Sequence, residues 1–247
     1  MTQNVHEQFV IGVDDTDVPD VGGTGKLVRS LSEQIEADGF GVSLGVTRHQ
    51  LLNHPKIPMT KRNSSAALGI ETERGLDDLE ELAVAFVRER SEVGSDPGVA
   101  VLSRHSDMPH ILAFGRRSQQ ELMKLLDAER FAAEGNVRLR ALGDGRGGSI
   151  GALAAAGLRA GGGDGRYVGL HGIREIAGNV TAGTIRAETG ILQVLDEESG
   201  EELDRDDVVY AGDWVRPRLI EGAPVLLTRR SPEDRKVWLP IDRKSNH

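Results

Sequence analysis

The sequence predicts an α+β fold built in two parts. An apolar strand, a polar loop, an amphipathic helix and a second strand follow one another at the start of the chain, which is a β-loop-α-β opening. Beyond about Tyr167, short β-like segments dominate instead. We place the boundary near Ala132–Gly135 and expect domains over residues 1–133 and 134–247.

The first strand is predicted over Phe9–Val13, a short apolar run. The helix that follows is predicted over Thr24–Asp38, because its leucine and isoleucine residues recur every fourth position and Gly39 ends it. Ser118 and Glu121 form a capping-box pattern that predicts a helix over 118–128. The remaining elements of this part are expected as strands over 42–46, 66–70, 99–102 and 137–142 and helices over 76–90 and 150–158.

The second part shows the turn-separated pattern of a sheet. The acidic stretch Asp196–Glu202 contains a Ser-Gly pair and is typical of a hairpin turn. Strands are expected over 167–170, 191–195, 208–210, 225–228 and 237–239.

Composition excludes several classes of function. The formal net charge is −9 and the pI is about 5.3, so the chain as a whole does not attract nucleic acid. The absence of cysteine excludes disulfides, thiolate zinc sites and a cysteine nucleophile. Neither a leader pattern nor a long apolar run is present, so we expect a cytoplasmic protein without membrane contact.

Three carboxylates, Asp14, Asp15 and Asp17, directly follow the first strand. Like charges this close cost free energy unless a cation compensates them, and Mg²⁺ prefers one or two carboxylates together with phosphate oxygens. We interpret this loop as a magnesium site that also serves catalysis. The alternative is a solvated acidic turn, because aspartate is common in turns.

A glycine-rich segment leads from this loop into the first helix. Gly22, Gly23 and Gly25 allow backbone N–H groups to approach an anion, and Lys26 adds a positive charge. The pattern is not a Walker A motif, because Leu27 stands where Ser or Thr is required. Thr24 is either a helix N-cap or a hydroxyl positioned to accept a phosphoryl group, and both can hold.

Two further segments are candidate nucleotide-binding regions. No acidic residue occurs between Gly39 and Ile70, a window that contains Arg48, Asn63 and Ser64. Its basic residues are Arg48, His49, His54, Lys56, Lys61 and Arg62. They suit a triphosphate or a nucleic-acid backbone, although a solvated basic loop is equally compatible with the charge pattern.

The second such segment carries the spacing G-x-G-x-x-G over 143–148. This pattern alone is weak support for a dinucleotide site. We expect Gly145, Arg146 and Gly147 to bind an anion or to form a tight turn. His105, Asp107 and His110 are candidates for acid–base or metal chemistry, but no spacing distinguishes them.

Five groups of residues occur in a fixed order along the chain: 13–19 with Thr24, Arg48 with 63–66, 96–99, 145–155 and 224–229. Together they resemble archaeal tRNA-isoleucine agmatidine synthase (agmatinylcytidine synthetase). The combined order is more specific than any single motif, and the resemblance touches nearly the whole chain.

The resemblance implies a kinase-like domain followed by a ferredoxin-like domain. It implies that the aspartate loop binds ATP and Mg²⁺, and that Thr24 matches a threonine that becomes phosphorylated. Family members activate the C2 carbonyl of a tRNA cytidine, and agmatine displaces the activated oxygen. Such an oxygen leaves poorly until it is phosphorylated, and phosphoryl transfer needs positioning and charge neutralisation.

The chain departs from the family at several points. Gly23 stands in place of the family's cysteine, and we recognise no OB-fold or zinc ribbon. We therefore expect an ATP-dependent ligase or kinase-like enzyme that acts on an acceptor carbonyl or hydroxyl. The acceptor is tRNA or a small molecule, with an amine such as agmatine as co-substrate, and tRNA binding is expected to be weak. The alternative is a non-catalytic nucleotide- or RNA-binding module that works with a partner chain.

Overall fold

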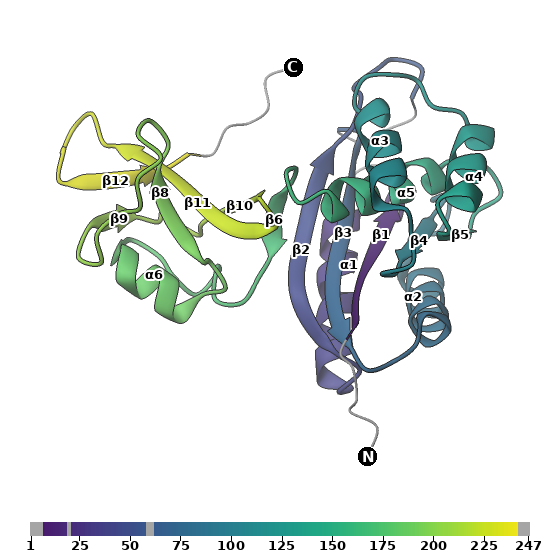
Figure 1. The fold of residues 1–247 in the computed structure, drawn as a ribbon, viewed down its shortest axis with the longest axis horizontal. Coiled ribbons are helices and arrows are strands. Elements are labelled where there is room, and N and C mark those ends of the chain that lie inside the picture. Colours follow the sequence, from purple (N-terminus) through teal and green to yellow (C-terminus); the bar gives the residue numbers. More distant parts are fainter. Residues whose placement is uncertain (1–6, 19–20, 58–61, 242–247) are drawn as a thin grey trace. The chain divides into compact units, whose positions relative to one another are not determined.

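A computed structural model describes residues 7–18, 21–57 and 62–241. It confirms the α+β class. The chain divides into two compact units, 1–161 and 162–247, and each is described by itself (Figure 1). Within the described residues, no helix is both long and apolar enough to cross a membrane.

The first unit contains an antiparallel sheet with strand order β5-β4-β1-β3-β2. Its strands are β1 (Glu7–Asp14), β2 (Val42–Gln50), β3 (Ser64–Thr72), β4 (Gly98–Leu102) and β5 (Arg138–Ala141). Its helices are α1 (Thr24–Ala37), α2 (Leu76–Arg90), α3 (Met108–Ser118), α4 (Leu125–Glu134) and α5 (Gly148–Ala160). The central strand β1 contacts both α1 and α5, and this coverage explains its apolar sequence.

The elements from β1 to β4 follow the order β-α-β-β-α-β, which characterises ferredoxin-like folds. The sequence resemblance had placed a ferredoxin-like domain after residue 133. The structure instead shows this order in residues 7–102, at the start of the chain.

Helices cover both faces of the first sheet. On β1, Phe9, Ile11 and Val13 share one face and are buried, and α1 contacts this strand. The opposite face, which carries Val10 and Gly12, packs against α5. Alternate residues of β1 therefore contribute to two different cores.

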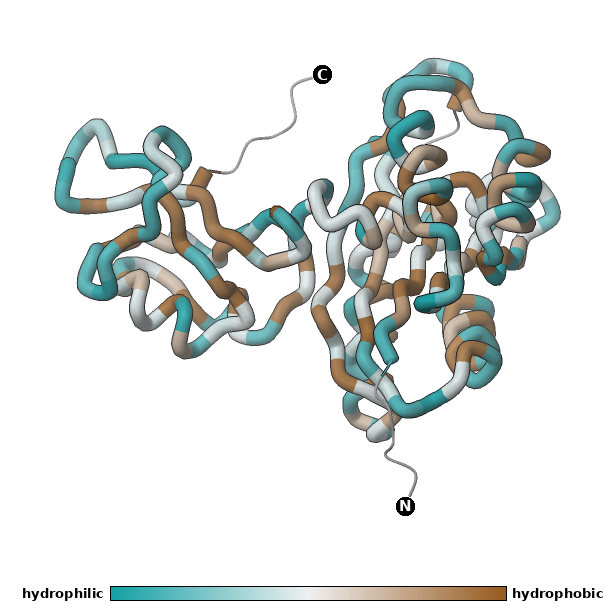
Figure 2. Tube along the Cα trace, viewed as in Figure 1, coloured by the Kyte–Doolittle hydropathy of each residue, from teal (hydrophilic) through white to brown (hydrophobic). Residues whose placement is uncertain are grey.

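Helix α5 lies unusually close to the sheet. A Cβ atom added to Gly12 would lie 2.1 Å from the carbonyl oxygen of Ala152, and one added to Gly98 would lie 2.3 Å from the carbonyl carbon of Gly148. The helix is rich in alanine and glycine and is buried on nearly all sides, so it has no solvated face. Figure 2 shows that hydrophobic stretches follow the strands of both units.

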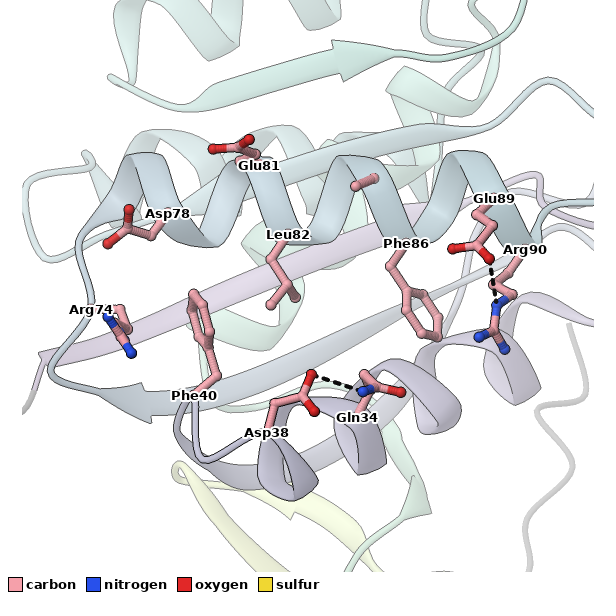
Figure 3. A pocket seen from close by; sticks show the side chains of 11 residues that line it. Gln34, Asp38, Phe40, Arg74, Asp78, Glu81, Leu82, Phe86, Glu89 and Arg90 are labelled. Atoms are coloured by element: carbon pink, nitrogen blue, oxygen red, sulfur yellow. Dashed lines mark hydrogen bonds and ion pairs between the residues drawn. The ribbon is translucent and has the colours of Figure 1, made fainter.

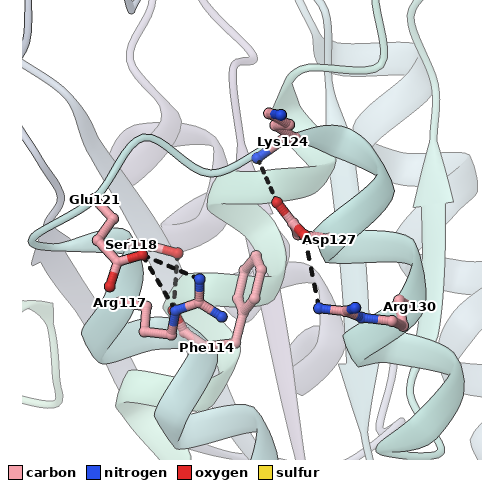
Figure 4. Close-up of polar contacts among 7 residues, drawn as sticks. All are labelled: Phe114, Arg117, Ser118, Glu121, Lys124, Asp127 and Arg130. Carbon is pink, nitrogen blue, oxygen red and sulfur yellow. Dashed lines mark hydrogen bonds and ion pairs between the residues drawn. The ribbon is translucent and has the colours of Figure 1, made fainter.

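The helix expected over 118–128 is wrong. Ser118 is the last residue of α3, and its hydroxyl donates to the carbonyl of Phe114. Helix α3 begins at Met108, and the carboxylate of its N-cap residue, Asp107, accepts from the N–H of His110. Its start was not recognised in the sequence, although the Asp-Met-Pro order is a helix-start signal. Figure 4 shows the connection to α4, in which the carboxylate of Asp127 accepts from the backbone of Lys124.

The second unit is mostly β-structure. Its strands are β6 (Arg166–Gly169), β7 (Asn179–Thr181), β8 (Gln193–Asp196), β9 (Val208–Tyr210), β10 (Arg218–Ile220), β11 (Ala223–Arg230) and β12 (Val237–Pro240). They follow the order β6-β10-β11-β12-β9-β7, and β8 pairs with β11 in parallel. One helix, α6 (Ala182–Glu188), packs on a core that includes Ile185, Val194 and Leu226.

The division between the units lies at Gly161–Gly162, beyond the boundary expected at 133/134. The reason is that β5 pairs with β4 and α5 packs on β1. Residues 134–161 therefore complete the first unit.

The contact between α5 and β1 yields a test of the fold. We predict that Gly12→Ala lowers the free energy of unfolding by about 1–3 kcal/mol or more, because the new methyl group overlaps the Ala152 carbonyl. Gly163→Ala is the matched control, since a Cβ there would meet nothing within 4 Å. Urea denaturation measures both, and equal stability of the two variants would contradict this packing.

Candidate functional site

The polar residues after β1 lie at one edge of the first sheet. Asp14 is paired with Gly98 of β4. On the other side, Val13 pairs with Ala66, so Asp14 and Ser65 stand next to each other on adjacent strands. The start of α5 reaches the same edge, because a Cβ on Gly151 would lie 1.8 Å from a carboxylate oxygen of Asp14.

The Asp14 carboxyl group is the most perturbed acid in this region. Burial, together with the charge of Asp15, raises its pKa from 3.8 to about 7. The Ser65 hydroxyl is close enough to lower that pKa in part. However, it makes no hydrogen bond of normal geometry to any described residue, although it is buried. A buried hydroxyl without such a partner costs free energy, so this corner has unused hydrogen-bonding capacity.

Asp15 has a left-handed backbone conformation with φ 55°. This conformation is uncommon for residues other than glycine and concentrates at functional sites. Burial raises the pKa of Asp15, and the nearby carboxylates of Asp96 and Asp17 raise it further. The backbone N–H of Asp96 donates to the Asp15 carboxyl group and opposes that shift. Asp15 therefore points toward the loop that precedes β4.

The Thr24 hydroxyl takes part in a small buried network. It donates to Oδ1 of Asp17 at 3.3 Å and accepts from the hydroxyl of Thr16 at 3.2 Å. Thr24 is the first residue of α1, whose N-cap is Gly23, and the N-cap position makes no side-chain hydrogen bond. The expectation that Thr24 is the N-cap is therefore wrong. Its hydroxyl faces a carboxylate instead of the backbone N–H groups of Gly22, Gly23 and Gly25.

The glycine-rich loop at 143–148 closes around an internal carboxylate. The backbone N–H groups of Arg146 and Gly147 donate to the two carboxylate oxygens of Asp96. Cβ atoms on Gly143 and Gly145 would lie 2.2 and 2.8 Å from those same oxygens. The side chain of Arg146 forms an ion pair with Glu129. The glycine spacing thus serves Asp96, and an external anion would compete with that carboxylate for the same N–H groups.

The remaining predicted binding residues lie around the same edge or on α1. The guanidinium of Arg48 donates to the hydroxyl of Ser64 at 2.8 Å. The Asn63 side chain donates to the carbonyl of Leu52 at 2.7 Å and thereby fixes the connection between β2 and β3. Lys26 is exposed in the first turn of α1. Pro19 and Lys61 lie outside the described residues.

The histidine candidates lie elsewhere. Asp107 caps α3, and His110 stacks on Phe131 with ring centroids 4.5 Å apart. His105 accepts from Arg104, and Arg104 forms an ion pair with Glu7 at the start of β1. These residues therefore lie at the end of the sheet opposite to Asp14, and the structure separates them from the aspartate loop.

A groove of about 590 Å³ lies between α1 and α2. Figure 3 shows Phe40, Leu82 and Phe86 between the two helices, with charged side chains around them. Arg74 and Arg90 lie over the rings of Phe40 and Phe86. None of the predicted site residues lines this groove.

The donors at the sheet edge fit a magnesium ion that also binds phosphate. Within the described part of the chain, no group of three or more His, Asp or Glu side chains is arranged to hold a metal ion. A site made by protein ligands alone is therefore not formed by these residues. Mg²⁺ commonly uses one or two carboxylates and completes its octahedron with phosphate oxygens and water. Asp14 and Asp15, with raised pKa values and few compensating charges, fit that smaller role.

Sequence reasoning missed three contributors to this site. In the sequence, Asp96 stands out only as part of the resemblance, and no role is predicted for Thr16 and Gly151. The signal for Asp96 was present in the glycine spacing, but only the fold shows which anion the loop surrounds.

Comparison with known proteins finds one curated relative and several solved structures that match about three fifths of the chain. No family model matches the chain. An uncharacterized protein of Methanocaldococcus jannaschii is 29% identical over 154 residues, which are 62% of this chain and 50% of that protein. The chain thus spans about half the length of this curated relative.

Solved structures of TiaS, a tRNA agmatidine synthetase, share the fold. The complex of TiaS with an isoleucine tRNA and ATP has a TM-score of 0.55 and 24% identity, over 62% of this chain and 36% of that one. The complex with tRNA, AMPCPP and agmatine has a TM-score of 0.53 and 23% identity, over 61% and 36%. A tRNA fluorescent labeling enzyme has a TM-score of 0.53 and 21% identity over the same shares. The chain therefore has a TiaS-like fold and spans about a third of these proteins.

The raised pKa of Asp14 predicts how stability depends on pH. Between about pH 4 and pH 7 the folded protein holds a proton on Asp14 that the unfolded chain releases, so the free energy of unfolding falls as pH rises. The total effect is at most about 4 kcal/mol, because one pKa unit corresponds to about 1.36 kcal/mol. We predict that Asp14→Asn flattens this slope and is more stable than the parent at pH 8 without divalent cations. Urea denaturation across this pH range, with exposed Asp144→Asn as control, would contradict the assignment if parent and Asp14→Asn had equal slopes.

The Asp96 clamp yields a second prediction for the same region. Asp96→Ala should lower the free energy of unfolding by roughly 1.5–3 kcal/mol, because charge-assisted hydrogen bonds to two backbone N–H groups are lost. Hydrogen exchange should quicken first at the amides of Arg146 and Gly147. Asp144→Ala changes an exposed carboxylate of the same loop and should change neither quantity. Unaltered exchange in Asp96→Ala would show that the loop does not depend on this carboxylate.

Proposed function

We propose that this chain uses Mg²⁺–ATP to phosphorylate Thr24 and then to activate an acceptor oxygen. The observation that carries the proposal is the hydrogen bond from the buried Thr24 hydroxyl to the Asp17 carboxylate. A hydroxyl is a weak nucleophile until a neighbouring base takes its proton. Asp17 is placed to act as that base, and the TiaS-like fold supports a nucleotide-dependent reaction.

The first step balances as a simple displacement. The Thr24 oxygen forms a bond to the γ-phosphorus, the bond from that phosphorus to the bridging oxygen breaks, and ADP leaves. The hydroxyl proton passes to Asp17. Phosphoryl transfer depends mainly on positioning and on neutralising charge. Asp17 contributes the base and Thr24 the nucleophile.

Charge neutralisation would come from both sides of the site. Asp14 and Asp15 would hold Mg²⁺, which neutralises charge on the transferring phosphate when it is bound. Lys26 and Arg48 contribute positive charge from the first turn of α1 and from β2, and Ser64 and Asn63 flank Arg48. The Ser65 hydroxyl, which is buried and makes no hydrogen bond of normal geometry to the described residues, offers a further donor to a bound oxygen.

In the second step the oxygen of an acceptor carbonyl or hydroxyl group bonds to the phosphorus of phosphothreonine, the bond from that phosphorus to the Thr24 oxygen breaks, and Thr24 takes its proton back from Asp17. A phosphorylated carbonyl oxygen becomes a good leaving group, and an amine then forms the new carbon–nitrogen bond as phosphate departs. Related structures hold tRNA, ATP or its analogue, and agmatine. We propose a related activation reaction for this chain, with tRNA or a small molecule as acceptor and an amine such as agmatine as co-substrate.

The alternative function is nucleotide or RNA binding without catalysis, together with a partner chain. One observation favours it, namely that Asp96 already occupies the N–H groups of the glycine loop. In addition, the chain spans only about a third of the related structures. A pure binding module would bind Mg²⁺–ATP without turnover.

The proposal is tested by incubating the full chain with Mg²⁺–ATP. We expect intact-mass and peptide analysis to show one phosphoryl group on Thr24. Thr24→Val should abolish it, and Asp17→Asn should slow it at least roughly a hundredfold, as for removal of a general base. Calorimetry should show much weaker ATP binding without Mg²⁺, because the carboxylates repel free triphosphate.

Controls distinguish catalysis from simple binding. Thr24→Ser keeps the hydroxyl and should retain phosphorylation. Product analysis with and without agmatine and total tRNA identifies the acceptor. ATP turnover with unmodified Thr24 would remove the phosphothreonine step, whereas tight Mg²⁺–ATP binding without turnover in any arm would favour the binding-module alternative.

A further inference from the structure

We propose that Thr16 is a positioning residue that directs the proton of Thr24 toward Asp17. The inference rests on the proposed phosphorylation of Thr24 and assigns a role to the residue whose hydroxyl donates to Thr24. It follows from one buried set of contacts among Thr16, Thr24 and Asp17.

Hydrogen-bond counting shows why the direction matters. The Thr24 hydroxyl has one proton and two lone pairs. The hydroxyl of Thr16 donates to Thr24 Oγ1 at 3.2 Å, and the backbone N–H of Thr16 approaches the same atom at 3.5 Å. With Thr16 as donor, the proton of Thr24 is left to point at Asp17 Oδ1, 3.3 Å away. The two donors of Thr16 thus approach both lone pairs of Thr24, and the longer contact, from the N–H at 3.5 Å, is the one that gives way when Thr24 attacks phosphorus.

The position of Thr16 is fixed by contacts outside the aspartate loop. Only 2% of its surface is exposed, and Thr24 is 7% exposed. The carbonyl of Thr16 accepts from the N–H of Glu92 at 3.0 Å. Glu92 belongs to a turn in which the Ser95 hydroxyl donates to its carbonyl at 2.7 Å. The donor that orients Thr24 is thus anchored to the segment after α2.

Without this donor the Thr24 hydroxyl could rotate. Its proton could then point away from Asp17, and the base would take it less often during the displacement. The expected loss is in the rate of phosphoryl transfer, because the Thr16 hydroxyl acts on Thr24 and Thr16 is itself only 2% exposed. A residue that served only to fill space would be replaced by valine without that loss, since valine has nearly the same shape.

The test compares Thr16→Val with Thr16→Ser in the full chain. We expect Thr16→Val to slow Thr24 phosphorylation at saturating Mg²⁺–ATP by roughly tenfold, the factor for one orienting hydrogen bond, with ATP affinity changed less than about twofold. Thr16→Ser restores the hydroxyl and should recover most of the parental rate. Thr228→Val is the matched control, because it removes another buried threonine hydroxyl, one that bonds to Leu195 in the second unit.

The possible outcomes test the positioning role of Thr16 separately from the proposed function. If Thr16→Val phosphorylates Thr24 at the parental rate, the positioning role is wrong while the proposed function stands. An equal slowing in Thr16→Val and Thr16→Ser would mean that packing, not hydrogen bonding, explains the effect and would also overturn the role. If the parent itself never becomes phosphorylated, the proposed function fails and this inference fails with it.

Discussion

The close approach of α5 to the sheet is the constraint on which the site depends. Helices usually pack 8–10 Å from their neighbours, at a distance set by the side chains between them. Here glycines remove those side chains, and the backbone of α5 contacts the strands at Gly12 and Gly98. This contact carries the start of the helix to the edge at which β1 ends. Gly151 then lies against Asp14, and the preceding loop surrounds Asp96.

Two carboxylates at this edge have opposite electrostatic roles. Asp96 accepts two backbone N–H groups at the start of a helix, where a negative charge is stabilised. For Asp14, burial and the charge of Asp15 outweigh the opposing effects of the Asp15 backbone and the Ser65 hydroxyl and raise its pKa to about 7. The raised pKa of Asp14 therefore arises mainly from its burial. Asp96 is held by the loop around it, whereas a bound cation could stabilise the negative charge of the buried Asp14.

The sequence predicted the elements of the first unit better than their arrangement. Helical periodicity predicted α1 and α2, each of which has an apolar face. A short apolar run predicted β1, and β3 was also expected as a strand. The prediction for the region between β4 and β5 was wrong, because the Ser118–Glu121 pattern resembles a helix start but lies where α3 ends. The loop after β1 lies where the sequence predicted it, at the end of a strand that is antiparallel to both neighbours. The role of Asp96 depends on a contact with residues 50 positions away, as in its bond to Arg146, and no local pattern contains that information.

The wide separation of the site's residues along the chain has a consequence for folding. Asp14 and Gly151 are more than half the chain length apart. The part of the site that Gly151 contributes is therefore synthesised long after Asp14. Contacts of such high sequence separation must overcome a large loop-closure entropy and form late. Until α5 docks, Asp14 and Asp15 remain hydrated and close to their ordinary acidity. The unusual electrostatics at this edge is therefore a property of the completed fold, acquired in the final stage of folding and lost first when α5 detaches.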